Sequence, residues 1–275
     1  MKHIRIFLMI ITVALLFGCG KEFLDYVPKG ALSGDLLTTP ERLDQLVISA
    51  YAGLAYEDHP FQSQSNMWTY GSVRSDDAYK GAAGTGDGAR LDRIERFLYY
   101  QPDESTHNGT WIRCYGGISR ANDALQKMED VSEQDYPKKI QRQAELRFIR
   151  GHYHFVLKLI FKYPVIADDK TAKADLNTLS NSEYTNDELW NIIAEDFQFG
   201  VDNLPETQSD VGRASKISAA AYLAKLRLYQ AYEQDEQHNV TGINTTRLQE
   251  VVDLCDIVIN SGQYSLFDDY AKNFL

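Results

Sequence analysis

Apolar side chains recur along most of this chain at the three- and four-residue spacing of helices that bury one face. Local signals mark the helix ends, such as the N-cap and first-turn proline in Thr38-Thr39-Pro40-Glu41, the capping-box pattern from Thr185 to Glu188, and Pro164. The pattern predicts helices over residues 39–54, 141–163, 185–204, 215–232 and 246–260, and another helical stretch after Trp111. Because no stretch alternates as a substantial sheet requires, the expected fold class is all-α.

Residues 57–108 interrupt this pattern. Gly, Ser, Asp and Asn are frequent there, and residues 81–88 (GAAGTGDG) cannot sustain a helix. We expect a long irregular segment between helices, and long loops of this kind are usually functional.

The predicted helices resemble one another in pairs. Ala144, Arg147 and Arg150 in one helix correspond to Ala221, Ala224 and Arg227 in a later one. Small residues at such spacing let helices approach closely, as in stacked tetratricopeptide pairs. The 34-residue tetratricopeptide period is not met, so we expect irregular tetratricopeptide-like pairs with long loops; an ordinary helical domain with chance similarity is the alternative.

The N-terminus has the features of an export signal. Lys2 and Arg5 precede a 12-residue apolar run, whereas a membrane-spanning helix needs roughly 20 residues. Leu16, Gly18 and Cys19 match a bacterial lipobox, in which the cysteine is acylated and becomes the new N-terminus. We therefore predict a signal peptide at 1–18, lipidation at Cys19, a lipidated tether at 19–38 and a helical domain over 39–275. A plain signal peptide that precedes a cysteine by chance is the alternative.

The chain is acidic, with 28 Lys and Arg against 39 Asp and Glu and a net charge of −11. This excess argues against nucleic acid as a partner and against a polybasic membrane surface, so the lipid is expected to do the anchoring. Cys114 and Cys255 fall in separate helical stretches and make no disulfide framework. Both are expected to be small buried hydrophobes, with a single bridge as the alternative.

Several segments, taken in order, resemble the SusD/RagB family of outer-membrane nutrient-uptake lipoproteins. Each is weakly specific by itself, but their succession is characteristic of the family. The segments are Cys19–Asp25 with Pro28–Gly30, Trp111–Asn122, Ala144–Phe155 with Phe161–Pro164, Gly212–Lys216, and Ala219–Tyr229. Family members are usually about twice this long, and this sequence lacks the family's C-terminal half. Whether the gene is truncated or the sequence is a fragment stays open.

The resemblance implies a surface-exposed lipoprotein, without enzymatic activity, that binds an oligosaccharide or other nutrient. It would sit on a SusC-type TonB-dependent transporter in the outer membrane and deliver the ligand to it. The stretch from Lys21 to Asp25 resembles the family's signal for display on the outer leaflet. The helical pairs are then expected to face the transporter, while the loops and the missing half form the ligand surface.

The irregular segment also contains a candidate sugar site. Sugar rings pack their C–H faces on aromatic rings, and their hydroxyls need carboxylates, amides and Arg as hydrogen-bond partners. Both kinds of group occur close together on a stretch that we expect to be non-helical. The candidate residues are Trp68, Tyr70, Arg74, Asp76, Asp77 and Tyr79. In the alternative interpretation Trp68 and Tyr70 only pin the loop to the helical body. Trp111 and Tyr115 lie one turn apart on a helix and are expected to be packing residues.

Other chemistries have weaker support. His152 and His154 point in different directions on a helix and cannot chelate one metal ion, and no calcium-loop or phosphate-loop spacing is present. We predict no metal, cofactor or catalytic residue. Two alternatives remain: a lipid-anchored tetratricopeptide-like scaffold that binds only protein, and a helical surface glycosidase. The acid pairs Asp76-Asp77, Asp168-Asp169 and Asp268-Asp269 are adjacent in sequence, whereas glycosidase carboxylates face each other across a ligand.

Overall fold

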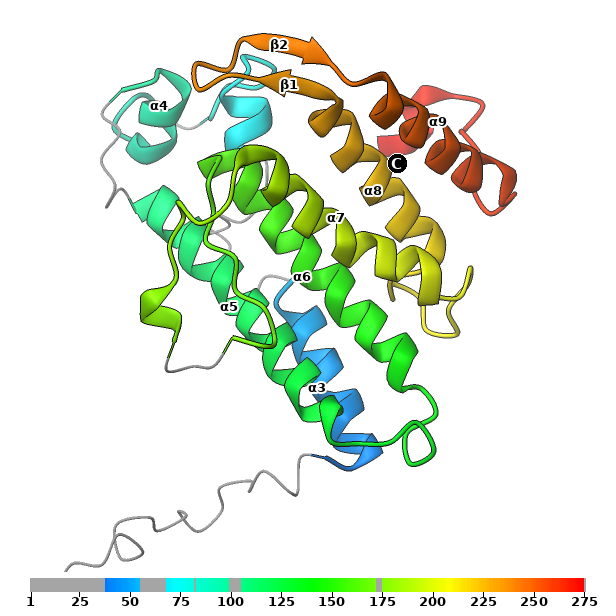
Figure 1. The fold of residues 1–275 in the computed structure, drawn as a ribbon. Helices are drawn as coiled ribbons and strands as arrows, with labels where there is room; N and C mark the ends of the chain where they lie inside the picture. The colour runs from blue at the N-terminus through cyan, green and yellow to red at the C-terminus, as the bar shows by residue number, and fades with distance from the viewer. Residues whose placement is uncertain (1–37, 55–67, 82, 99–104, 172–174, 275) are drawn as a thin grey trace, which may run out of the picture. The chain divides into compact units, whose positions relative to one another are not determined.

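The fold is built from helices that begin and end close to the predicted positions (Figure 1). The computed structural model describes residues 38–54, 68–81, 83–98, 105–171 and 175–274. The predicted signal peptide, Cys19 and the tether up to residue 37 lie outside these residues. The long helices are α3 (Pro40–Ala52), α5 (Ser105–Glu129), α6 (Lys139–Phe161), α7 (Asn186–Asn203), α8 (Lys216–Ala231) and α9 (Thr245–Asn260).

The end signals act as expected. At the start of α7 the Thr185 hydroxyl accepts a hydrogen bond from the Glu188 amide, and the Glu188 carboxylate accepts one from the Thr185 amide. This reciprocal pair confirms the capping box. A second box, between Ser215 and Ser218, starts α8.

The irregular segment contains more helix than we predicted. Its described parts include the π-helical turn η2 (Thr69–Val73) and the short helix α4 (Ala89–Glu95), and α5 begins at Ser105, well before Trp111. Elements of one or two turns bury too few positions to show a period. The glycine-rich stretch does form turns, and the Lys80 ammonium donates hydrogen bonds to the carbonyl oxygens of Gly81, Gly84 and Asp87 there.

A small antiparallel hairpin follows α8 and was not predicted. Strands β1 (Tyr232–Gln234) and β2 (Val240–Ile243) pair Tyr232 with Ile243. Strands of three and four residues are too short to show alternation. The Asp235 carboxylate holds the turn, because it accepts hydrogen bonds from the amides of Gln237 and Asn239. Two 3-10 turns, η3 (Leu176–Thr178) and η4 (Tyr270–Phe274), complete the elements.

Consecutive long helices pack on one another in chain order from α5 to α9, and α3 packs on α5 and α6. Small residues permit close approach: a Cβ atom at Gly117 on α5 would lie 2.1 Å from the Tyr153 ring on α6, and one at Gly200 on α7 would lie 2.9 Å from Ala219. The mainly helical fold with irregular, closely packed helix pairs is confirmed. Trp111 and Tyr115 are half-buried against the core, and the Tyr115 hydroxyl donates to the Val165 carbonyl.

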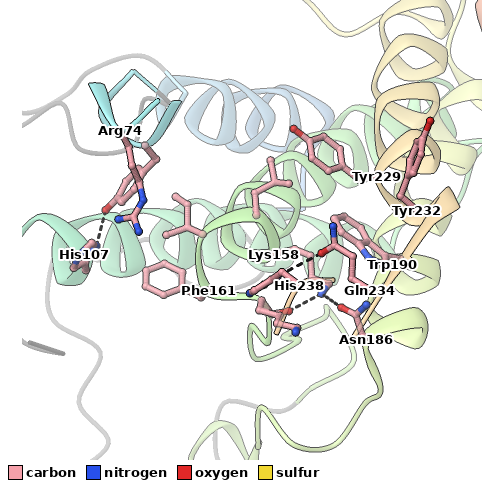
Figure 2. A pocket seen from close by; sticks show the side chains of 14 residues that line it. Arg74, His107, Lys158, Phe161, Asn186, Trp190, Tyr229, Tyr232, Gln234 and His238 are labelled. Atoms are coloured by element: carbon pink, nitrogen blue, oxygen red, sulfur yellow. Dashed lines mark hydrogen bonds between the residues drawn. The ribbon is translucent and has the colours of Figure 1, made fainter. Parts of the chain in front are cut away.

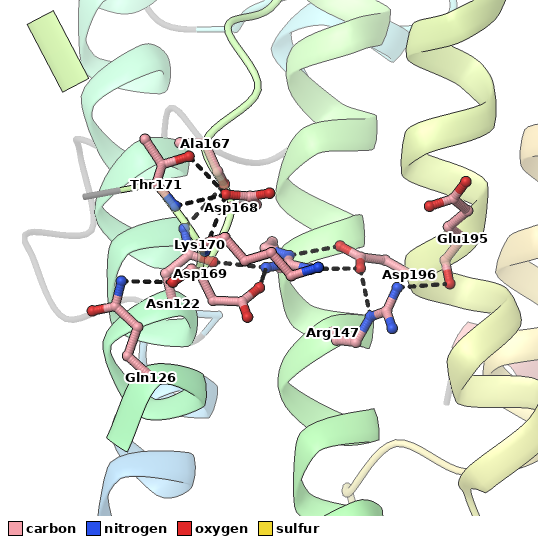
Figure 3. Close-up of polar contacts among 11 residues, drawn as sticks. Asn122, Gln126, Arg147, Ala167, Asp168, Asp169, Lys170, Thr171, Glu195 and Asp196 are labelled. Atoms are coloured by element: carbon pink, nitrogen blue, oxygen red, sulfur yellow. Dashed lines mark hydrogen bonds and ion pairs between the residues drawn. The ribbon is translucent and has the colours of Figure 1, made fainter. Parts of the chain in front are cut away.

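A buried ionic network centred on Arg150 joins α5, α6, α7 and the segment after α6 (Figure 3). The guanidinium makes two hydrogen bonds of 2.8 Å to the Asp196 carboxylate on α7. It also bonds to Asn122 on α5, at 3.0 Å, and pairs with Asp169. Arg147 donates to the same Asp196 carboxylate at 2.8 Å. Both members of the acid pair Asp168-Asp169 therefore have structural partners. Asp169 pairs with Arg150, and the Asp168 carboxylate accepts hydrogen bonds from the amides of Lys170 and Thr171.

The outer face of α9 is sparsely covered. Leu254 is its buried residue, while Val252, Ile259 and Cys255 are exposed. The prediction of a buried Cys255 is therefore wrong, whereas Cys114 is buried as predicted, and both are free cysteines. No helix in the described part of the chain is both long and apolar enough to span a membrane.

Candidate functional site

The ends of several helices surround a cavity of about 840 Å³ (Figure 2). Because consecutive helices alternate in direction, the start of α5, the end of α6, the start of α7 and the end of α8 meet on the same side of the helix layer (Figure 1). The hairpin and η2 supply the remaining walls. The cavity is lined by Tyr70, Arg74, His107, Lys158, Leu159, Ile160, Phe161, Lys162, Asn186, Trp190, Tyr229, Tyr232, Gln234 and His238.

Aromatic rings form one wall of the cavity. The rings of Trp190 and Tyr229 lie 19° from parallel with their centroids 6.2 Å apart, and Phe155 packs behind both. Trp190 is buried, whereas Tyr229 and Tyr232 are more than 40% exposed. The wall thus combines a fixed ring with accessible ones, which suits stacking against a ligand ring.

Lys158 is a buried cation at the end of α6. Its side chain is almost fully enclosed, and its ammonium donates to the Lys162 carbonyl at 2.6 Å and to the Asn186 amide oxygen. The ammonium also lies 4.8 Å from the centroid of the Trp190 ring. Burial, together with the neighbouring Lys162 charge, lowers the pKa of Lys158 to about 8.

Lys162 ends α6 in a strained backbone conformation. Its φ of 59° and ψ of −49°, with a hydrogen bond of 2.6 Å from the Tyr163 amide to the Phe161 carbonyl, define a classic γ-turn. Such strain is commonest at functional sites. The turn directs the Lys162 ammonium to the hairpin, where it donates to the Asp235 carbonyl at 3.0 Å and lies 3.5 Å from Glu236.

The opposite wall contains two of the six predicted sugar-binding residues. The Tyr70 hydroxyl lies 3.1 Å from His107 Nδ1 and 3.3 Å from the Thr110 hydroxyl on α5. The Arg74 guanidinium lies over the Phe97 ring, 4.2 Å from its centroid. Tyr70 therefore attaches η2 to α5 and also faces the cavity.

The other four predicted residues do not line the cavity. Trp68 and Tyr79 are exposed by 41% and 60%, and Asp76 and Asp77 are also exposed. The expectation that this stretch is non-helical is wrong at Thr69–Val73, which turns as a π-helix because the Val73 amide bonds to the Trp68 carbonyl. The role of these residues in binding stays a prediction.

Most residues that line the cavity were not predicted from the sequence. Lys158, Trp190, Tyr229 and Gln234 are separated by long stretches of chain, and only helix packing brings them together. One signal could have pointed to part of the site: the run KLIFKYP at 158–164 places two lysines among aromatic residues at a helix end.

The cavity offers flat apolar surface beside hydrogen-bonding groups. Its polar lining consists of lysine, arginine, histidine, amide and phenol groups; among the described residues that line it, none is Asp or Glu. Most glycosidases use a facing pair of carboxylates, and the described lining contains no such pair. No group of three or more potential metal ligands occurs within the described ranges.

Comparison with known proteins places this geometry in context. A family profile described as "Starch-binding associating with outer membrane" matches residues 22–228. Surface glycan-binding protein A from Bacteroides fluxus is 24% identical with a TM-score of 0.68, and the match covers 86% of this chain and 47% of that one. The Bacteroides thetaiotaomicron protein of the same name, in complex with laminarihexaose, is 20% identical with a TM-score of 0.67, covering 86% and 46%.

A SusD superfamily protein from Parabacteroides distasonis is 23% identical with a TM-score of 0.63, covering 87% of this chain and 48% of that one. This chain therefore spans less than half the length of these solved structures. No curated protein sequence matches it.

Proposed function

This chain belongs to the SusD-like family, described as starch-binding and associating with the outer membrane, and from that premise we propose that it binds glycans in the cavity at the ends of α6, α7 and α8. The observation that carries the proposal is the aromatic wall of Trp190 and Tyr229 facing amide and cationic donors across an 840 Å³ space. Flat rings accept the C–H faces of sugars, while Asn186 and Gln234 supply partners for hydroxyl groups.

Substitution of the exposed aromatic residue tests the cavity directly. Tyr229→Ala removes a stacking surface without emptying the core, because nearly half of that side chain is already exposed. The loss of one aromatic platform costs about 1–3 kcal/mol, or roughly 5- to 150-fold in affinity. Retardation in native gels that contain neutral or acidic polysaccharides measures this loss, and circular dichroism checks the fold.

Matched controls separate the cavity from the predicted loop site. Trp68→Ala and Tyr79→Ala test two of the residues proposed from the sequence, and Tyr264→Ala removes an equally large exposed ring outside both the cavity and that set. If Trp68→Ala weakens binding and Tyr229→Ala does not, the loop carries recognition and the cavity proposal is wrong. If Trp68→Ala unfolds the protein, Trp68 is a packing anchor.

We also propose that acylation of Cys19 holds the protein on the outer face of the outer membrane. A multiply acylated cysteine anchors far more firmly than a single chain. Cys19→Ala should move the protein from the membrane fraction to the soluble fraction and abolish incorporation of labelled palmitate. Unchanged membrane retention of this variant rejects the assignment.

The family supports delivery of the bound glycan to a SusC-type TonB-dependent transporter, without hydrolysis. Affinity purification of the tagged protein from detergent-solubilised envelopes should recover such a transporter. Incubation with a bound oligosaccharide should release no shorter products. Recovery of protein partners without any glycan retention favours the scaffold alternative instead, and glycan cleavage favours the glycosidase.

A further inference from the structure

We propose that the cavity selects acidic glycans, whose sugars carry carboxylate or sulfate groups, over neutral ones. This inference rests on the proposed glycan binding and specifies its ligand class. Its basis is the arrangement of charge at the end of α6, where cations gather in a chain that is otherwise strongly acidic.

The cavity lining is positively charged, whereas the whole chain has a negative net charge. Arg74, Lys158 and Lys162 face the cavity together with His107 and His238, and the described lining residues include no carboxylate. The net charge of the chain is −11. A local concentration of positive charge in a concave, partly apolar space focuses the field on an anionic ligand.

Lys158 forms no ion pair with a carboxylate in the described part of the chain, although the more distant Glu236 charge partly offsets its own. Its ammonium is held by the carbonyl of Lys162, the amide oxygen of Asn186 and the face of Trp190, all of which are neutral. Among the described residues, no carboxylate forms an ion pair with it. A buried charge is costly unless an opposite charge compensates it, and a ligand anion at this position supplies that compensation.

Lys162 has a countercharge that a ligand can replace. Glu236 lies 3.5 Å from its ammonium, and the Glu236 side chain is 68% exposed, outside the cavity lining. Such an exposed pair contributes little to stability. A ligand carboxylate or sulfate can therefore take over Lys162 at small cost, and Glu236 competes with it at the rim.

The charges lie beside the aromatic wall, so one sugar can use both. The Lys158 ammonium is 4.8 Å from the centroid of Trp190, which in turn is parallel to Tyr229. A sugar stacked on exposed Tyr229 occupies the same cavity that the two lysines line. A lysine ammonium attracts a full negative charge more strongly than the partial charge of a hydroxyl, which favours an acidic substituent there.

The test compares glycans that differ only in charge, with the full chain as the binding protein. Isothermal titration with tetragalacturonate and with its carboxyl-reduced counterpart isolates the carboxylate, and chondroitin sulfate oligosaccharides with and without sulfate isolate the sulfate. We expect the more highly charged member of at least one pair to bind about 10-fold or more tightly than the counterpart that lacks the added group.

Matched variants assign this preference to the cavity. Lys162→Gln should remove most of the preference, because it should weaken the acidic member far more than the counterpart that lacks the acidic group. Lys225→Gln, which removes the same charge from an exposed position on α8 outside the cavity, should have no effect. Glu236→Gln should strengthen binding of the acidic member several-fold, because it removes the competitor.

The outcomes separate this inference from the proposed function. If neutral glycans bind, Tyr229→Ala weakens them and neither acidic set binds more tightly, the glycan site stands and the charge preference is rejected. If Lys162→Gln and Lys225→Gln weaken binding of the acidic member equally, the preference is a non-specific effect of net charge, and the inference is also rejected. If no glycan of any charge binds in a manner sensitive to Tyr229, the proposed function itself fails.

Discussion

Arg150 and Lys158 are both buried cations on α6, about two helical turns apart, but their surroundings are opposite. Arg150 meets two carboxylates, Asp196 and Asp169, and an amide (Figure 3). Lys158 meets a carbonyl, an amide and an indole ring (Figure 2). The first cation is neutralised inside the protein, and the second faces a cavity.

This difference in surroundings makes Arg150 a structural charge and leaves the charge of Lys158 available to a ligand. Burial alone lowers the pKa of each group, but for Arg150 the attraction of Asp196 and Asp169 outweighs it, so that its pKa is raised. For Lys158 burial prevails and Lys162 adds to it, so that its pKa falls to about 8. The planar arginine fork suits fixed bidentate pairing, whereas a lysine responds to its environment.

The first prediction concerns Arg150, the structural cation, and has the largest expected effect on stability. Arg150→Met leaves the buried Asp196 without its bidentate partner and should cost about 3–5 kcal/mol of unfolding free energy in urea titrations. Arg147→Met is the control, because Arg147 makes only one bond to Asp196 and is more exposed, and its cost should be clearly smaller. Similar losses in both variants contradict a central role for Arg150.

A second prediction concerns acid pH and His154, which is buried beside Asp196 and Arg150. Burial lowers the pKa of His154 to about 4 from its ordinary value of 6.5. Between these values the unfolded chain takes up a proton that the folded chain does not, so His154 makes stability fall as pH falls, by about 1.4 kcal/mol per pH unit. Burial also lowers the pKa of His152 to about 4, and this residue adds a similar slope. Urea unfolding from pH 7 to 4.5 measures the slope.

His154→Leu should remove about half of the total slope, because His152 keeps its share, and His238→Asn, on the exposed hairpin turn, should leave it unchanged. The pKa of Asp196 is also lowered, since Arg150 and Arg147 outweigh its burial. Its stabilisation is present above the unfolded value of about 3.9 and is lost only at lower pH. An unchanged slope in His154→Leu assigns the acid sensitivity to other groups.

A third prediction concerns the cavity at alkaline pH. As pH rises through about 8, Lys158 loses its proton, and affinity for tetragalacturonate should fall by up to about 10-fold between pH 7 and 9.5. Lys162 and Glu236 are the charged groups that also act on Lys158. Affinity for the carboxyl-reduced tetrasaccharide should stay constant in parallel titrations; an equal fall for both ligands attributes the change to the fold.

The smallest expected effect tests the strain at Lys162. Lys162→Gly and Lys162→Ala both remove the charge, but only glycine adopts the observed φ of 59° readily. The glycine variant should be about 1 kcal/mol more stable than the alanine variant in urea titrations. Both should lose the preference for acidic glycans. Equal stability of the two variants shows that the γ-turn is not strained.

The helices could be predicted from the sequence, because their signals are local. Apolar spacing, Thr185 with Glu188 and the stop at Pro164 act within a few residues, and the observed ends agree with them. The sequence also identified the family, through segments spread along the chain, and those segments lie mostly within the helices that build the fold. Tyr70 and Arg74 were identified as candidate ligand residues, and both line the cavity.

Helix packing brings the charges and rings together. Nothing near Arg150 or Lys158 in the sequence says that one faces Asp196 and the other a cavity, because those neighbours come from another helix. The same holds for Trp190 and Tyr229, and for Cys255, whose exposure depends on what covers α9. The hairpin likewise could not be predicted, because its strands are too short to show an alternating pattern. Its Asp235 carbonyl accepts a hydrogen bond from Lys162 only in the folded chain.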